Sequence, residues 1–288
     1  MILDKVDRVD RLEPREFKTN YLNKKPVVFT GMSQDWPAYK AWSLEYMQEK
    51  IGHHTVPLYK TGAFNPRASF NAAHTEMNFA DYIQLIQQGP TDLRVFLLNA
   101  LKLNPDLLND FSTPDVMDGF LNSFPTLFFG SENAFVFMHY DLDMGHVFHT
   151  QFCGSKRVVL FSPENNVQVY QVPFSVRSFM ELDADNPDFA RFPALKFARG
   201  FATTIEHGET LYIPSGWWHQ LRYLSVGFGL SQRAMADTWS RRFKAAYNVG
   251  VMPAIENIAR KTAGESWMNL KNKWALGRGD RYLNRNCS

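Results

Sequence analysis

The sequence predicts a mainly β fold, a barrel or double-sheet jelly roll, preceded by helices and strands and followed by a helical segment. From residue 126 onward, short runs of β-forming residues alternate with turns at close spacing, as in all-β barrels and jelly rolls. Aromatic residues make up 15% of the chain, including 24 Phe, which suits thick packing against sheets. We therefore divide the chain into residues 1–125, 126–236 and 237–288.

The first region is predicted to mix helices and short strands. Apolar residues at helical spacing predict helices at residues 12–25, 43–52, 78–88 and 105–111. Ser43 is a suitable N-cap for the second helix, and Gly52 marks its end. Apolar or alternating runs predict strands at residues 27–29, 54–60 and 94–98.

The central region is predicted to be built almost entirely of strands. Eight are expected, at residues 126–129, 135–139, 147–152, 157–161, 167–172, 210–213, 220–224 and 227–230. Residues 183–198, which contain Pro187 and Pro193, are expected to form a loop or helical insert between them.

The last region is predicted to be helical. Asp237 can cap a first helix, Pro253 is expected to interrupt it, and two further amphipathic segments follow. These Trp-bearing apolar faces lie outside the β core and need a cover. A homodimer interface would supply it, as would packing on the N-terminal helices.

Charge and cysteine content limit the class of protein. Residues 237–288 carry ten Lys or Arg and four Asp or Glu, so their net charge is +6 in a chain of +2. Such a segment either binds nucleic acid or an acidic partner, or is a solvated helix face. Only Cys153 and Cys287 occur, which predicts a reducing, cytoplasmic location. No apolar run reaches the roughly 18 residues of a membrane span, so no membrane partner is expected.

The chemistry is predicted to lie at a His-X-Asp pair in the β region. His139 and Asp141 are two residues apart, so on an extended strand they point the same way. A third ligand can come from His219, which follows the rigid turn in GETLYIPSGWWH. Two histidines and one carboxylate form the facial triad of non-haem Fe(II) enzymes, which leaves one face of the metal open for a co-substrate and O2.

These motifs resemble the jumonji-C (JmjC) or cupin-like family of Fe(II)- and 2-oxoglutarate-dependent oxygenases, in its compact hydroxylase branch. The matching stretches, in order, are KKPVVFTG, HYD, QFCGSKRVVLFSP and GETLYIPSGWWH, and they cover roughly residues 25–233. The resemblance implies a double-stranded β-helix with a C-terminal helical dimerisation segment. It implies that His139, Asp141 and His219 are the metal ligands and the catalytic centre, and that Lys156 binds the distal carboxylate of 2-oxoglutarate.

The chain departs from the family pattern in the co-substrate pocket. Val136 stands where members often carry Thr or Ser, and Val147 where they often carry Asn. Either the co-substrate pocket is less polar than in other members, or other residues bind the co-substrate; the candidates are Arg233, as a lower-ranked alternative to Lys156, with Asn99, His149, Ser231 and Thr150. Residues expected to support the ligands or line the pocket are His149, His146, Gln151, Tyr212 and Trp218.

The function implied by the resemblance is hydroxylation, or demethylation through hydroxylation, of a protein side chain. A tRNA base or a small molecule is the alternative substrate, and the basic C-terminal segment favours tRNA mildly. Two other classes stay open: a non-catalytic JmjC-like binding scaffold, and a cupin metalloenzyme that does not use 2-oxoglutarate.

Overall fold

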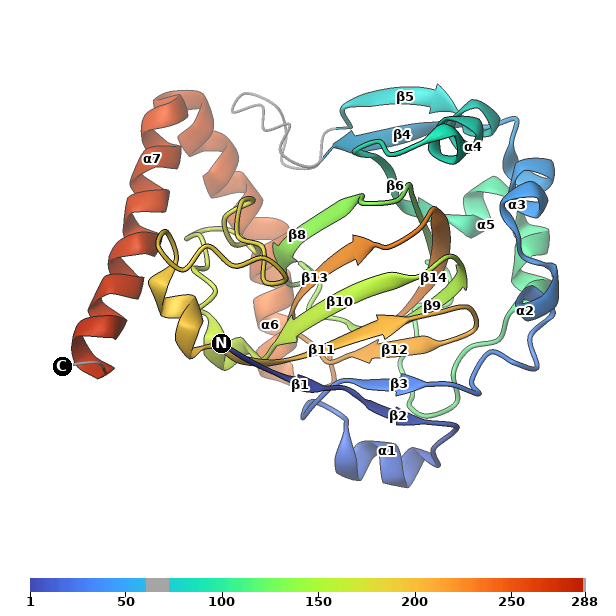
Figure 1. Ribbon diagram of the computed structural model, residues 1–288, viewed down its shortest axis with the longest axis horizontal. Coiled ribbons are helices and arrows are strands. Elements are labelled where there is room, and N and C mark those ends of the chain that lie inside the picture. The colour runs from blue at the N-terminus through green and yellow to red at the C-terminus, as the bar shows by residue number, and fades with distance from the viewer. Residues whose placement is uncertain (61–72, 287–288) are drawn as a thin grey trace.

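Two sheets face each other in the computed structural model, which describes residues 1–60 and 73–286 (Figure 1). The smaller sheet has five strands, in the order β1 (Ile2–Lys5), β11 (Arg199–Ile205), β10 (Lys156–Phe161), β13 (Trp218–Tyr223) and β8 (Phe135–His139). The larger has nine, in the order β2 (Asp7–Val9), β3 (Val27–Phe29), β12 (Thr210–Ile213), β9 (His146–Cys153), β14 (Gly227–Ala234), β7 (Thr126–Gly130), β6 (Leu93–Asn99), β4 (Thr55–Lys60) and β5 (Thr75–Asn78).

The predicted fold class is confirmed: the chain is mainly β, with two facing sheets and a C-terminal helical segment. In both sheets the order of the strands differs from their order along the chain. Neighbouring strands such as β9 and β14, or β10 and β13, come from distant parts of the sequence. The strands before residue 125 extend the larger sheet at both of its ends, so the first region completes the barrel.

Helices of the first region pack at both ends of the larger sheet: the helix that carries Phe17 packs near β3, β9 and β12, and the others pack near β4, β6 and β7 (Figure 1). They are α1 (Pro14–Asn20), α2 (Pro37–Ala41), α3 (Leu44–Ile51), α4 (Phe79–Gln88), α5 (Ala100–Leu103) and the 3-10 helix η1 (Pro105–Asp110). The Ser43 side chain accepts a hydrogen bond from the backbone of Tyr46, so the predicted N-cap is confirmed. Asn78 caps α4 in the same way.

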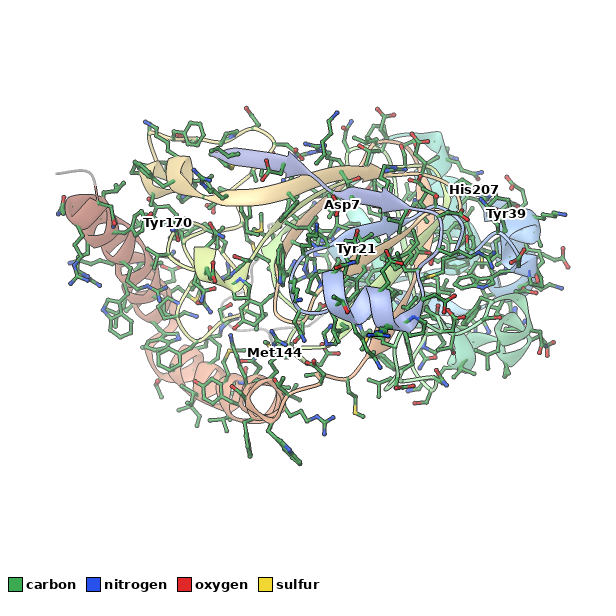
Figure 2. All side chains as sticks on the ribbon, turned by 90° about the horizontal axis from the view of Figure 1, so that it is seen from below. Asp7, Tyr21, Tyr39, Met144, Tyr170 and His207 are labelled. Carbon is green, nitrogen blue, oxygen red and sulfur yellow. The ribbon has the colours of Figure 1, made fainter. Side chains whose placement is uncertain are left out.

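One of the eight predicted strands is wrong. Residues 167–172 form consecutive turns after the 3-10 helix η2 (Pro163–Asn165), with local hydrogen bonds such as Tyr170 N to Val167 O. Their apolar side chains are buried by packing, not by strand pairing, and the Tyr170 ring lies against the C-terminal helix at Gly279 (Figure 2). Strand β11 was not predicted; it follows the expected irregular insert, which contains only the short 3-10 helix η3 (Pro193–Phe197).

The C-terminal segment is nearly continuous and helical. It comprises α6 (Trp239–Ala246), the π-helical turn η4 (Tyr247–Val251) and α7 (Met252–Asn286). Thr238, not Asp237, is the N-cap of α6. The predicted break at Pro253 is wrong, because this residue lies in the first turn of α7, where a missing N–H is tolerated.

The break in the C-terminal segment occurs at Gly264, where φ is 51° and ψ is −125°, and α7 turns back on itself (Figure 1). The buried Glu256 carboxylate joins the two limbs, because Lys271 and Trp267 bind it from beyond Gly264, whereas Arg260 binds it from within its own limb. Arg260 Nε lies 2.7 Å and Lys271 Nζ 2.6 Å from Glu256 Oε1, and Trp267 donates to Oε2. In the part of the chain that is described, no helix is both long and apolar enough to cross a membrane.

Candidate metal centre

Two neighbouring antiparallel strands position the two histidines. His139 is the last residue of β8, and its Cα partner on β13 is His219. The centroids of their rings are 4.2 Å apart. Because side chains alternate along a strand, the neighbouring Met138 and Tyr140 point the other way and are buried in a hydrophobic core.

Asp141 completes the group two residues after His139. One ligand atom from each of His139, Asp141 and His219 lies within 4.8 Å of the others. Nδ1 of His139 lies 2.8 Å from the Phe137 carbonyl oxygen, and Nδ1 of His219 lies 3.0 Å from that of Trp217. If each Nδ1 donates to its carbonyl, each Nε2 keeps its lone pair for a metal, which is the usual way that outer hydrogen bonds orient ligating histidines. The donor set therefore fits Fe(II).

The protonation states suit metal binding. Withdrawal from water lowers the pKa of His139 to about 3, and the adjacent His219 contributes to the same shift. Burial also lowers the pKa of His219. Burial alone would raise the pKa of Asp141, but the Arg233 guanidinium and the two histidines outweigh it and hold that pKa below its usual range. At neutral pH the site thus presents two neutral imidazoles and one carboxylate, the forms that bind metals.

Arg233, on β14, is paired with two carboxylates. Its Nη1 lies 3.1 Å from Asp141 Oδ2 and 3.1 Å from Asp143 Oδ1. These carboxylates raise the pKa of the guanidinium against the opposing effect of burial. Because its charge is already compensated, Arg233 is poorly placed to be the main partner of a further anion.

The three ligand candidates open into a cavity of about 60 Å3 between the sheets. Three cations line it, Arg94, Lys156 and Arg233, against the single carboxylate of Asp141. Val136 and Val147 also line it, so the apolar departures noted in the sequence do face this space. The excess of positive charge suits an anionic occupant.

Lys156 is a buried cation at the start of β10. Only 1% of it is exposed, and no Asp or Glu in residues 1–60 or 73–286 forms an ion pair with it. Its Nζ lies 3.0 Å from His149 Nε2 and 4.4 Å from the centroid of the Tyr223 ring. Burial lowers the pKa of Lys156 well below its ordinary value. An ammonium held in this way is stabilised by an incoming carboxylate.

The other predicted pocket residues divide into two groups. His149 and Ser231 line the cavity, and His149 Nδ1 lies 2.7 Å from Ser231 Oγ. Asn99 does not line it, because its side chain caps α5 and donates to the Ser123 carbonyl. The geometry therefore gives no support to a co-substrate role for Asn99.

Five further predicted residues also lie outside the cavity lining. His146 and Tyr212 bond to each other on the opposite face of the larger sheet, with His146 Nδ1 2.9 Å from the Tyr212 hydroxyl. Trp218 is buried in a core and donates to Asn166. Gln151 donates to the Cys153 carbonyl, and Thr150 bonds to Thr210. Cys287 lies outside the described residues.

Seven residues that line the cavity were not predicted from the sequence: Arg94, Val95, Phe96, Phe128, Ile213, Leu221 and Tyr223. Arg94 stands near the start of an otherwise apolar strand, and a charged residue in such a run is a signal for a buried functional position. Phe128 and Tyr223 carry no comparable signal, because aromatic residues are common in strands.

Comparison with known proteins identifies the family. The cupin-like domain family matches residues 14–249. Lysine-specific demethylase JMJ21 of Arabidopsis thaliana is 29% identical over 79% of this chain, and lysine-specific demethylase 8 of Xenopus tropicalis is 28% identical over 75%. The tRNA wybutosine-synthesizing protein 5 of Gallus gallus is 26% identical over 73% of this chain and 70% of its own length.

The similarity covers 25% of the Arabidopsis protein and 49% of the Xenopus protein, so the chain spans a quarter to a half of those relatives. It takes in the strands that carry His139, Asp141, Lys156 and His219. Since the family match extends over most of the sequence and its relatives are of the JmjC type, the chain belongs to the cupin-like (JmjC) domain family.

Proposed function

We propose that this protein is an Fe(II)- and 2-oxoglutarate-dependent oxygenase that hydroxylates, or demethylates through hydroxylation, a protein side chain. The proposal rests on one observation: two features of the site open into the same cavity. A two-histidine, one-carboxylate triad opens into the same space as a buried lysine that has no acidic partner among the described residues.

His139, Asp141 and His219 would hold the iron. Three protein ligands leave positions for a chelating co-substrate and for O2, which a closed four-ligand site would not. When bound, Fe(II) supplies the redox chemistry by which O2 oxidises 2-oxoglutarate and a C–H bond of the substrate. His219 and Lys156 are only 5% and 1% exposed, so the site is largely shielded from water.

Lys156 would bind the distal carboxylate of 2-oxoglutarate, and Arg233 would orient the Asp141 ligand. The two cations differ in their partners. Arg233 already faces two carboxylates, whereas the Lys156 ammonium contacts only a histidine nitrogen and an aromatic ring in the described chain. A dianion entering the cavity gains most from the cation that has no counter-charge.

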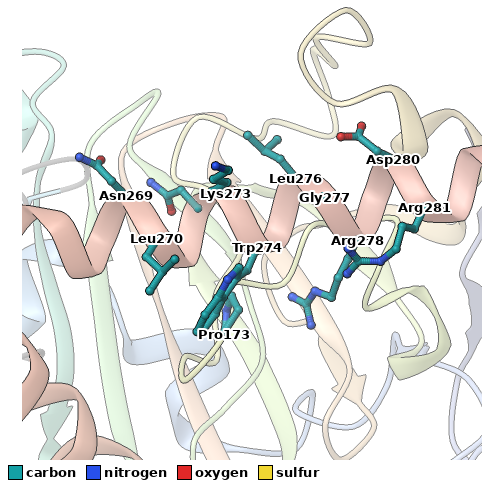
Figure 3. Close-up of a pocket in the computed structure, with 11 residues that line it drawn as sticks. Pro173, Asn269, Leu270, Lys273, Trp274, Leu276, Gly277, Arg278, Asp280 and Arg281 are labelled. Carbon is teal, nitrogen blue, oxygen red and sulfur yellow. The ribbon is translucent and has the colours of Figure 1, made fainter.

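A protein side chain is the preferred substrate because two of the relatives are named lysine-specific demethylases. A tRNA substrate is the second candidate, since another relative is a tRNA wybutosine-synthesizing protein. One surface favours it: Trp274 lies beside Pro173 in a hollow on α7 that Lys273, Arg278 and Arg281 also line (Figure 3). Exposed aromatic rings among cations are a common surface for stacking single-stranded nucleic acid.

The test of the proposed activity is turnover of 2-oxoglutarate. Purified protein with Fe(II), ascorbate, O2 and 2-oxoglutarate should form succinate slowly without substrate, and faster with the correct protein or tRNA. The Asp141→Ala variant should form none. A binding scaffold would form no succinate with any candidate substrate. A cupin metalloenzyme that does not use 2-oxoglutarate would show activity that survives Lys156→Ala.

Protein and tRNA substrates are separated by a second comparison. Soluble-extract protein and total tRNA are offered in parallel, each before and after treatment with protease or ribonuclease, and succinate is measured above the substrate-free rate. Stimulation that protease removes supports the protein substrate. Stimulation that ribonuclease removes, and that Trp274→Ala weakens, supports tRNA.

A further inference from the structure

We infer that His149 is a positioning residue that fixes the Lys156 ammonium and turns the Ser231 hydroxyl toward the cavity, so that ammonium and hydroxyl bind the distal carboxylate of 2-oxoglutarate together. This inference rests on the proposed function. In this arrangement the Lys156 ammonium and the Ser231 hydroxyl would make the polar contacts that Val136 and Val147 cannot make.

The three residues come from three strands and form a continuous chain of contacts across the barrel. His149 on β9 and Ser231 on β14 are Cα partners in the larger sheet. Lys156 begins β10 in the smaller sheet. His149 Nε2 lies 3.0 Å from Lys156 Nζ, and His149 Nδ1 lies 2.7 Å from Ser231 Oγ. The imidazole therefore links the two sheets inside the cavity.

The direction of each hydrogen bond follows from the chemistry of the groups. An ammonium has donors and no acceptor, so Lys156 donates to Nε2 of His149. A neutral imidazole with an accepting Nε2 carries its proton on Nδ1, which then donates to Ser231 Oγ. The hydroxyl accepts this bond, and its own hydrogen stays available to a further acceptor.

That further acceptor is expected in the cavity. His149 is the only hydrogen-bond partner of Ser231 Oγ within the described chain, and Ser231 lines the cavity. The Lys156 ammonium likewise has donors left after its bond to His149. A carboxylate oxygen can accept from both the ammonium and the hydroxyl, and hydrogen bonds between charged partners are among the stronger ones.

Packing keeps the imidazole in place. Its ring meets Phe128 edge to face, with centroids 5.8 Å apart. On its other side, a Cβ at Gly229 would come within 2.8 Å of His149 Nε2, so the glycine leaves the room that this ring needs. His149 is only 4% exposed and has little freedom to turn away from Lys156.

The experiment measures the affinity of metal-loaded, anaerobic protein for 2-oxoglutarate and for 2-oxobutyrate by calorimetry, with Mn(II) in place of Fe(II). The second ligand keeps the 2-oxo acid and lacks the distal carboxylate. Four proteins are compared: wild type, His149→Phe, His149→Gln and Ser231→Ala. Thermal unfolding and Mn(II) affinity are recorded for each, to show that the fold and the metal centre are intact.

Wild type should prefer 2-oxoglutarate strongly. His149→Phe and Ser231→Ala should each weaken 2-oxoglutarate binding about tenfold or more, the size expected for a lost hydrogen bond to a charged group, and leave 2-oxobutyrate binding unchanged. His149→Gln should restore most of the affinity, because an amide can accept from Lys156 and donate to Ser231.

Three outcomes overturn the inference, and they can be distinguished. If wild type binds 2-oxoglutarate and the folded His149→Phe and Ser231→Ala variants bind it equally well, the positioning role is wrong while the proposed function stands. If Mn(II)-loaded wild type binds no 2-oxoglutarate at all, the proposed function fails and the inference fails with it. Equal losses for both ligands would also contradict it, since a role at the distal carboxylate predicts a selective loss.

Discussion

Arg233 Nη1 lies 3.1 Å from Asp141 Oδ2, so the carboxylate of the candidate metal centre is also one half of a buried ion pair. A metal ligand that is held in this way has its orientation set before a metal arrives. The same ion pair links the stability of the fold to the metal centre, because removing the Asp141 carboxylate leaves the Arg233 guanidinium with Asp143 alone.

The Asp141→Ala variant is therefore expected to lose metal binding and stability together. The loss of one partner of a buried pair predicts a free energy of unfolding lower by about 3 kcal/mol. Urea unfolding and Co(II) absorption measure the two effects. Asp143→Ala is the matched control: this carboxylate also pairs with Arg233 but is 40% exposed, so the expected loss is below about 1 kcal/mol, with Co(II) binding kept. Equal Co(II) affinity in the two variants would contradict the assignment.

Lys156→Met is expected to stabilise the ligand-free protein while removing co-substrate binding. The ammonium is buried without an acidic partner in the described chain, and Met fills a similar volume without the cost of burying a charge. A gain of about 1 kcal/mol is expected in thermal unfolding without ligand. Lys271→Met is the control, because its ammonium lies 2.6 Å from Glu256 and its removal should destabilise. A less stable Lys156→Met protein would show that the ammonium is already compensated.

Co-substrate binding should take up a proton at pH values above the pKa of Lys156 in the free protein. Burial lowers the pKa of Lys156 in the free protein, whereas a bound carboxylate favours the ammonium and raises that pKa again. As pH rises through the free-protein pKa, the affinity for 2-oxoglutarate should therefore fall by up to about tenfold per pH unit. Calorimetry in buffers of different ionisation enthalpy counts the protons. Lys156→Arg keeps its charge, so its affinity should be independent of pH over the same range.

The exposed face of α6 is expected to form a homodimer interface. No residue of this helix is buried within the chain, and Trp239 and Phe243 are 73% and 72% exposed. Large apolar side chains on one helix face need a cover, and a second copy would provide it symmetrically. Light scattering should give a dimer for wild type and a monomer for Trp239→Ser/Phe243→Ser. Phe197→Ser, which removes an exposed aromatic ring outside this segment, should stay dimeric.

The sequence was sufficient for the features that depend on local pattern. The spacing of two residues predicted that His139 and Asp141 lie on one side, and the turn before His219 leads into the neighbouring strand; the structure brings all three together, although Asp141 lies just beyond the end of β8. The apolar lining at Val136 and Val147 was expected from the resemblance to the family, whose members often carry polar residues at these two positions.

Features that depend on distant parts of the chain were not predictable. The pairing of Arg233 with Asp141 joins β14, an interior strand of the larger sheet, to the turn after β8 of the smaller sheet, and no local pattern records it. Residues 167–172 have the alternation of a strand, but their apolar side chains are buried against α7, so tertiary packing overrode the periodicity. Pro253 looked like a helix break, yet the reversal lies at Gly264, which alone has the required backbone conformation.

The most direct test of the central claim is anaerobic titration of Fe(II)-loaded protein with 2-oxoglutarate, followed by visible absorption. Chelation of the co-substrate by iron gives a weak charge-transfer band. Wild type should develop the band, Asp141→Ala should not, and Lys156→Ala should develop it only at much higher concentrations of 2-oxoglutarate. If wild type binds Fe(II) but shows no band at saturating 2-oxoglutarate, the oxygenase assignment is wrong, and a metal-binding scaffold or another cupin activity must replace it.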